Sequence, residues 1–134
     1  WNKFIFFKDP IDKDNVIPTA RKSDILIHSI VDTPLTKWGT NPTKLYDYMS
    51  AGRPVICSFN SPNLPIYDAN CGYSIEAGHP EKIADALIEF SKLTEHEKYS
   101  MGLRGYDYAK EHFNSQKLAK KLENLFLEAV NRAT

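Results

Sequence analysis

Thr43, Lys44 and Asp47 are the residues of this chain whose types and spacing best suit the chemistry of ligand binding. They follow Asn41 and Pro42, a pair typical of a helix start, where Asn caps the helix and Pro fits its first position. The free backbone N–H groups and the dipole of a helix start attract phosphate. Asp47 lies four residues after Thr43, on the same face and one turn further along. A phosphate site followed by a carboxylate about 5 Å along the helix suits a nucleotide whose ribose hydroxyls need an acceptor.

Each of these side chains also has a simpler structural explanation. Lys44 could be a solvated first-turn side chain, although a lysine there opposes the helix dipole, and a bound anion would offset that repulsion. Asp47 could be a surface carboxylate. Thr43 and Asn41 are capping residues first, and their amides could also contact a ligand.

The elements on either side of this helix place its start at a ligand-binding edge. We expect Gly52 to end the helix in a left-handed conformation, with Pro54 preventing its continuation. Residues 25–27 and 55–58 read as two strands, the first a continuous apolar run typical of a sheet covered on both faces. The polar loop 29–40 joins the first strand to the helix. In parallel α/β sheets, ligands bind where such loops leave the carboxyl ends of strands.

The remaining pattern alternates strands with helices. Residues 4–7 and 71–75 read as strands, residues 12–22 as a short helix, and residues 66–69 as one helical turn. Pro80 begins a helix, the capping box from Thr94 to Glu97 opens a second, and Asn114 or Ser115 opens a third. Two of these helices carry apolar stripes, predicted as Ile83, Ala84, Leu87 and Ile88, and as Leu118, Leu122, Leu125, Phe126, Ala129 and Val130. The predicted fold is α/β, a Rossmann-like parallel sheet with helices on both faces.

Composition limits the classes of function. With 134 residues the chain is expected to form one domain, 1–134, and its formal net charge of zero argues against an electrostatic nucleic-acid binder. No apolar run approaches the length of a transmembrane helix. Cys57 and Cys71 lack metal-ligand spacing and are interpreted as buried reduced thiols rather than a disulfide, which suits a cytoplasmic protein. Because Trp1 stands where a natural start would carry Met, we expect a piece of a longer protein.

Two further residues near the loop have open roles. His28 ends the strand at the ligand edge and could touch a sugar or phosphate, although a satisfied structural histidine is the more common case. Trp38 could stack on a base or a sugar, or could simply cover the loop. None of the histidines has metal-ligand spacing and no acidic cluster suggests a metal, so no metal is expected. No cofactor is expected either.

Several motifs together resemble the C-terminal part of a family-4 glycosyltransferase of the GT-B fold. The resemblance covers nearly the whole chain, and its spacing is more specific than any single piece. The matching segments are Ser23-Asp-Ile-Leu-Ile27, Pro42-Thr-Lys-Leu-Tyr-Asp-Tyr-Met-Ser-Ala-Gly-Arg-Pro-Val55, Cys71-Gly-Tyr73 and Gly78-His-Pro-Glu81.

The resemblance implies that this domain holds a nucleoside-diphosphate sugar, the donor, while a separate N-terminal domain holds the acceptor. In that family two glutamates lie eight positions apart, and the second binds the ribose hydroxyls. Asp47 matches the second position, whereas the first falls on Gly39, so that carboxylate is absent and loop amides would replace it. The implied donor-binding residues are Gly39, Thr40, Asn41, Thr43, Lys44, Leu45 and Asp47. The catalytic residues are not assignable from this chain.

The leading hypothesis is therefore the donor-binding domain of a retaining glycosyltransferase, which transfers a sugar (as a hexosyltransferase does) to a hydroxyl acceptor. The setting would be polysaccharide or glycolipid biosynthesis, with the acceptor glycan or glycolipid held by the missing domain, which leaves the fragment alone inactive. We expect a cytoplasmic enzyme, with peripheral association at the inner membrane face. One alternative is a non-catalytic flavodoxin-like binding module, which would not distinguish a nucleoside diphosphate from its monophosphate. Another is a sugar-nucleotide epimerase or phosphorylase of the GT-B fold.

Overall fold

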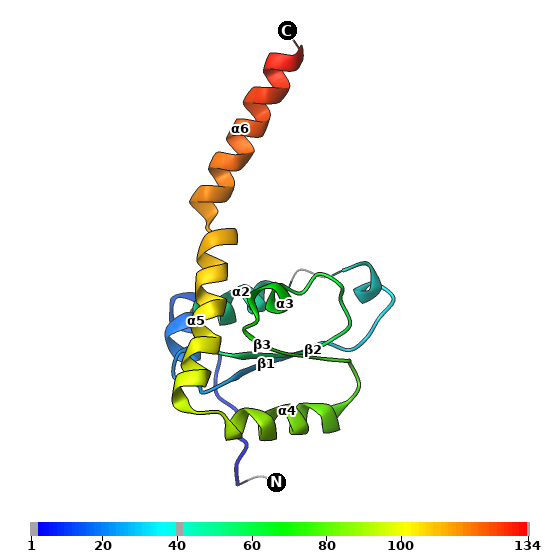
Figure 1. Cartoon of the computed structure of the whole chain (residues 1–134), viewed down its shortest axis with the longest axis vertical. Helices are drawn as coiled ribbons and strands as arrows, with labels where there is room; N and C mark the ends of the chain where they lie inside the picture. The colour runs from blue at the N-terminus through cyan, green and yellow to red at the C-terminus, as the bar shows by residue number, and fades with distance from the viewer. Residues whose placement is uncertain (1–2, 40–41, 134) are drawn as a thin grey trace.

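The computed structural model describes residues 3–39 and 42–133, and within them it confirms an α/β fold. The described residues form a three-stranded sheet. Figure 1 shows this sheet in the middle, with α2 and α3 on one side of it and α4 on the other. The elements in chain order are η1 (Lys13–Asn15), α1 (Val16–Ala20), β1 (Leu26–Ser29), η2 (Thr36–Trp38), α2 (Thr43–Ser50), β2 (Val55–Ser58), α3 (Pro65–Ala69), β3 (Gly72–Ile75), α4 (Pro80–Lys92), α5 (Glu95–His112) and α6 (Ser115–Ala133).

The sheet is parallel throughout, with strand order β1-β2-β3. Leu26 pairs with Val55, and Val55 pairs with Gly72, so the three strands start level with one another. The central strand β2 is buried along its whole length. In contrast, β1 alternates between half-buried and exposed residues, and Ile27 is 42% exposed. The prediction that β1 is covered on both faces was therefore wrong for this edge strand.

Alternation along β2 divides the core into two layers. Val55 and Cys57 point to one face, where they belong to one cluster with Leu45 and Met49 of α2. Leu45 and Met49 are four residues apart and so lie on the same side of their helix. Ile56 points to the other face and packs in the cluster that includes α4. This arrangement holds α2, and with it the candidate site, firmly against the sheet.

The predicted boundaries of α2 are close to the observed ones. The helix begins at Thr43, with Pro42 in the cap position and no side-chain cap, one residue later than predicted. Asn41, the predicted cap, lies outside the described residues. The helix ends as predicted, because Gly52 has φ +68° and its N–H bonds to the carbonyl of Met49 at 2.9 Å.

Two glycines of α5 lie close to the backbone that follows α2 and to Cys71. A Cβ atom on Gly102 would lie 2.2 Å from the carbonyl oxygen of Gly52, and one on Gly105 would lie 3.0 Å from Cβ of Cys71. The absence of side chains lets the two backbones approach closely. The start of α5 is the predicted capping box, with the N–H of Glu97 donating to Oγ1 of Thr94 at 3.3 Å.

The apolar stripe of α4 is rotated from the predicted one. Ile83 and Leu87 pack on the core as expected, but Ile88 is 54% exposed. Ala86 and Phe90 are buried in its place. The helix packs on the sheet through residues 83, 86, 87 and 90. The observed stripe and the predicted one both follow the helical repeat of three and four residues, so the sequence alone does not choose between them.

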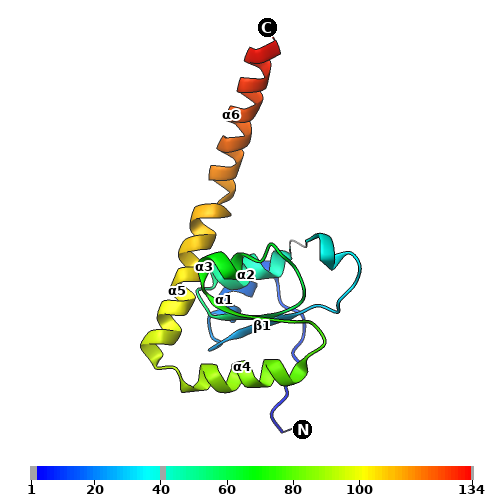
Figure 2. The same cartoon turned by 45° about the vertical axis from the view of Figure 1, so that its right-hand side comes forward.

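Two predicted packing features differ at the ends of the chain. Residues 4–7 do not form the predicted strand, and Phe4, Phe6 and Phe7 are each more than three-quarters exposed. A short apolar run becomes a strand only when a neighbouring strand takes its backbone hydrogen bonds. The helix α6 is present as predicted, but its apolar stripe is exposed, and Figures 1 and 2 show the helix extending away from the sheet.

Both cysteines are free and buried, as predicted. Burial raises the pKa of the Cys57 thiol to about 12 and that of Cys71 to about 11, because the interior disfavours the thiolate. These thiols therefore act as small core side chains.

Candidate functional site

The start of α2 lies at the edge of the sheet where the strands end, because α2 follows β1 in the chain. The chain leaves β1 at Ser29, passes through η2, and enters α2 at Thr43. Figure 2 shows the described part of this connection, residues 30–39, extending beyond the end of the sheet. The first N–H groups of a helix have no partner within the helix, so this start can bind an anion.

The predicted donor residues fall into three different environments. Thr43 and Lys44 are exposed on the first turn of α2. Leu45 is completely buried in the core and its N–H donates to the carbonyl of Pro42 at 3.0 Å, so its side chain cannot reach a ligand. Gly39 is half-buried with φ +95°, and Thr40 lies outside the described residues together with Asn41.

Asp47 is half-buried and faces α1. It lines a cavity of about 320 Å³ together with Lys13, Asp14, Val16 and Ile17. The structure therefore brings Asp47 close to η1 and α1, a contact that the sequence did not indicate. A carboxylate that lines a small cavity, one turn from the start of α2, can accept hydrogen bonds from a hydroxyl pair.

His28 is held beside this helix start. Its ring meets Tyr48 edge-on at 6.4 Å and Phe59 at 5.5 Å between centroids, and its Nε2 is buried with no hydrogen-bond partner among the described residues. Burial, and then the charge of Lys44, lower the pKa of His28 below its ordinary value. The histidine is therefore neutral near pH 7, and no described group satisfies its Nε2.

Lowering the pH should destabilise the protein through His28. The unfolded chain takes up a proton at the ordinary pKa of about 6.5, while the folded protein resists it until a lower pH. The free energy of unfolding should therefore fall as the pH drops through that value. The His28→Gln variant should lack this contribution to the pH dependence. Urea unfolding at several pH values from 7.5 downward measures the slope. The exposed His96→Gln serves as the control, and an unchanged slope in His28→Gln would contradict this account.

A hydrogen-bond network that the sequence did not reveal links the loops after all three strands. Asn60, after β2, donates through Nδ2 to Oδ2 of Asp32 at 3.1 Å, and accepts from the N–H of Ala77, after β3, at 3.2 Å. Asp32 also accepts from the hydroxyl of Thr36 at 2.7 Å. Thr36 is buried, so the network anchors η2 to the end of the sheet. Asp32 and Asn60 are 28 residues apart in the sequence, so no local pattern predicts their hydrogen bond. The parallel topology brings the two loops together.

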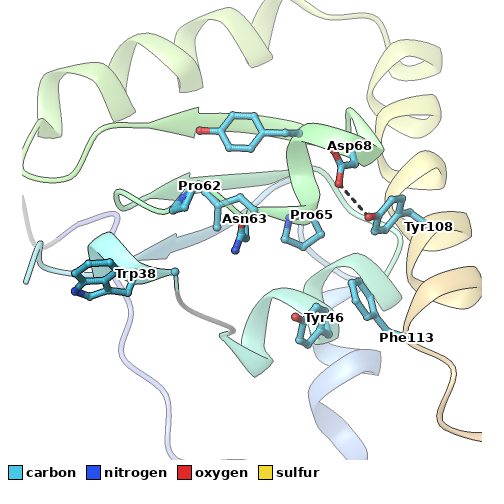
Figure 3. Close-up of a pocket in the computed structure, with 11 residues that line it drawn as sticks. Trp38, Tyr46, Pro62, Asn63, Pro65, Asp68, Tyr108 and Phe113 are labelled. Carbon is cyan, nitrogen blue, oxygen red and sulfur yellow. Dashed lines mark hydrogen bonds between the residues drawn. The ribbon is translucent and has the colours of Figure 1, made fainter. Parts of the chain in front are cut away.

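A larger cavity, here named the aromatic cleft, lies on the other side of α2. Its volume is about 680 Å³, and Figure 3 shows Tyr46 and Phe113 side by side near Tyr108, with Trp38 at the far end. Among the predicted donor residues that the structure describes, Gly39 lines it. The cleft is formed by Trp38, Gly39, Tyr46, Pro62, Asn63, Leu64, Pro65, Tyr67, Asp68, Tyr108 and Phe113.

Metal ligation and membrane spanning find no support in the described part of the chain. Within residues 3–39 and 42–133, no group of three or more His, Cys, Asp or Glu side chains is placed to hold a metal ion. No described helix is both long enough and apolar enough to cross a bilayer.

Comparison with known proteins finds a distant relative of this chain. The chain is similar to a glycosyltransferase. It is 26% identical over 131 residues to an uncharacterized glycosyltransferase of Methanocaldococcus jannaschii. The alignment covers 97% of this chain but 32% of the relative, so the chain spans about a third of that protein's length. No family model matches the chain.

The likeness is to one part of that glycosyltransferase. The α/β sheet flanked by helices is consistent with a Rossmann-like half-domain of such an enzyme.

Proposed function

We propose that this chain is the donor-binding domain of a retaining glycosyltransferase with the GT-B fold, related to family 4. The substrate would be a nucleoside-diphosphate sugar, and the product a hexosyl glycan or glycolipid. The observation that carries the proposal is the likeness to a glycosyltransferase along 97% of the chain. The position of the α2 start at the carboxyl end of β1 supports it.

Each group at the α2 start would have a defined task. The free N–H groups of the first turn and the ammonium of Lys44 would bind the diphosphate and stabilise the negative charge that grows as it departs. Asp47, one turn further, would accept hydrogen bonds from the ribose hydroxyls. The acceptor would be held by a separate domain of the enzyme. We propose that this enzyme acts in polysaccharide or glycolipid assembly at the cytoplasmic face of a membrane.

Nucleotide binding by the intact chain tests this proposal. We expect calorimetric titration to detect binding of at least one of UDP, GDP and ADP, and weaker binding of the matching monophosphate, because the second phosphate adds charge at the helix start. Equal affinity for diphosphate and monophosphate would instead indicate a flavodoxin-like binding module. Failure of all three diphosphates to bind at millimolar concentration would refute the donor-site assignment.

Asp47→Ala should weaken binding of the selected diphosphate by about 1–3 kcal/mol, the cost of leaving a buried polar group without its hydrogen-bond partner. The half-buried position of Asp47 at the cavity beside α1 makes these bonds less screened than at an open surface. The matched control is Asp107→Ala, at an exposed position of α5. Full affinity in Asp47→Ala would remove the ribose role and leave the fold unaffected.

A further inference from the structure

The aromatic cleft is built differently from the start of α2. It lies between η2, the Tyr46 side of α2, α3 and the last turn of α5. Its volume of about 680 Å³ is within the usual range of small-molecule sites, roughly 300–1,000 Å³. Tyr46 and Asp47 are neighbours on α2, yet they line two separate cavities. Asp47 and Tyr46 therefore face different sides of the helix, while Gly39, a predicted donor residue, lines the cleft.

Aromatic rings form one wall of the cleft. The ring of Tyr46 lies 4.2 Å from that of Phe113 between centroids, and Phe113 lies 5.8 Å from Tyr108. Because these rings pack against one another, they line one side of the cleft and do not surround a ligand as an aromatic cage for a cation would. Trp38 stands at the opposite end of the cleft and is 89% exposed (Figure 3). Apolar surface gathered in a groove, as it is here, is typical of sites that bind a ligand.

The polar groups of the cleft are a carboxylate and an amide. Oδ2 of Asp68 accepts from the hydroxyl of Tyr108 at 3.2 Å, and both Asp68 and Asn63 are exposed. Burial and the bond to Asp68 raise the pKa of Tyr108, which keeps its hydroxyl protonated. Asp68 is thereby fixed on α3 and can still accept further hydrogen bonds, since each carboxylate oxygen has more than one acceptor site.

This combination selects a neutral, hydroxyl-rich ligand. Asp68 is the only charged residue among the described residues that line the cleft, so an anion such as a diphosphate would be repelled. A sugar ring fits both surfaces, because its C–H faces carry partial positive charge that suits the negative faces of aromatic rings, and its hydroxyls donate to carboxylates and amides. We propose that the aromatic cleft binds a pyranose ring of a glycan. This goes beyond the proposed nucleotide site and does not depend on it.

Amide NMR of the full chain with uncharged methyl glycosides tests the proposal. Methyl α-glucoside, α-galactoside and α-mannoside are titrated to high millimolar concentration. We expect at least one to give saturable shifts at residues 63–68 and 108–113. Trp38→Ala and Asp68→Asn should each weaken that binding about tenfold, the scale of one hydrogen bond to a charged group or one stacked ring. Trp38 is so exposed that its removal should leave the fold intact.

Matched controls place the effect in the cleft. Asp107→Asn on α5 and Phe126→Ala on α6 are exposed residues that do not line the cleft, and both should bind the glycoside as the unmodified protein does. The proposal is overturned if no glycoside gives saturable shifts there, or if the two cleft variants bind with full affinity. It is equally overturned if tetramethylammonium, a probe for cation–π binding, binds in the cleft and the glycosides do not.

The two proposals fail separately. Glycoside binding without nucleotide binding would refute the donor site and leave the sugar cleft standing. Nucleotide binding that depends on Asp47, without glycoside binding, would do the reverse. Asp68→Asn should retain its nucleotide affinity, since Asp68 does not line the cavity that holds Asp47.

Discussion

Replacing Leu45 by Ala should lower the free energy of unfolding by about 2–5 kcal/mol, the usual cost of removing a fully buried leucine side chain. Leu45 has no exposed surface and lies in the cluster that joins α2 to β2. Because α2 leaves the sheet only when this cluster opens, the loss is felt by the whole domain. Urea unfolding followed by circular dichroism measures it.

The neighbouring Lys44→Ala is the matched control. Its side chain is exposed, so stability should stay within about 0.5 kcal/mol of the unmodified protein. The two variants should also separate stability from binding. Leu45→Ala, studied under conditions where it is folded, should retain nucleotide affinity, whereas Lys44→Ala should lose part of it. A Leu45→Ala protein of normal stability would show that the core is not organised around this helix.

Gly102→Ala should destabilise the protein by about 1–3 kcal/mol or more, the cost of forcing atoms into a packed site. The added Cβ would lie 2.2 Å from the carbonyl oxygen of Gly52, 2.8 Å from its carbonyl carbon and 3.1 Å from Cα of Arg53. All three are backbone atoms at the turn that follows α2, so no flexible side chain can move aside. The helix α5 would have to shift away from α2.

The direction of the stability change in Gly102→Ala distinguishes a crowded site from an open one. At an unhindered helix position, Gly→Ala stabilises by about 1 kcal/mol, because alanine has the higher helix propensity. Lys110→Ala, at an exposed site of α5, should change stability little and serves as the control. Thermal or urea unfolding of both variants distinguishes the outcomes. Stabilisation by Gly102→Ala would show that α5 does not approach the turn as closely as described.

Local chemistry was sufficient to predict most elements of the domain. Gly52 and the Thr94–Glu97 capping box marked helix ends correctly because their effects depend on residues nearby in the sequence. The alternation of strands and helices along the chain also predicted the parallel sheet, because a helix between two strands returns the chain to the same edge of the sheet. Boundaries shifted by a residue, as at Thr43, where a proline rather than a capping side chain precedes the helix.

Features that depend on distant neighbours were not predictable. Residues 4–7 have the composition of a strand, but a strand also needs a partner, which the local pattern does not specify. The rotated stripe of α4 depends on where the helix lies on the sheet. The network through Asp32 and Asn60 and the aromatic cleft draw on loops and helices far apart in sequence, so the polar and aromatic residues gave no sign of their meeting.

The most direct test of the account is to map where a nucleoside diphosphate binds. Amide NMR of the full chain with the tightest-binding of UDP, GDP and ADP should give its largest shifts at residues 43–47 and along the cavity formed with α1, and smaller shifts with the monophosphate. Asp47→Ala should reduce these shifts at equal ligand concentration. Shifts confined to the aromatic cleft or to α6, or the absence of any saturable shift, would contradict the claim that the start of α2 is a donor site.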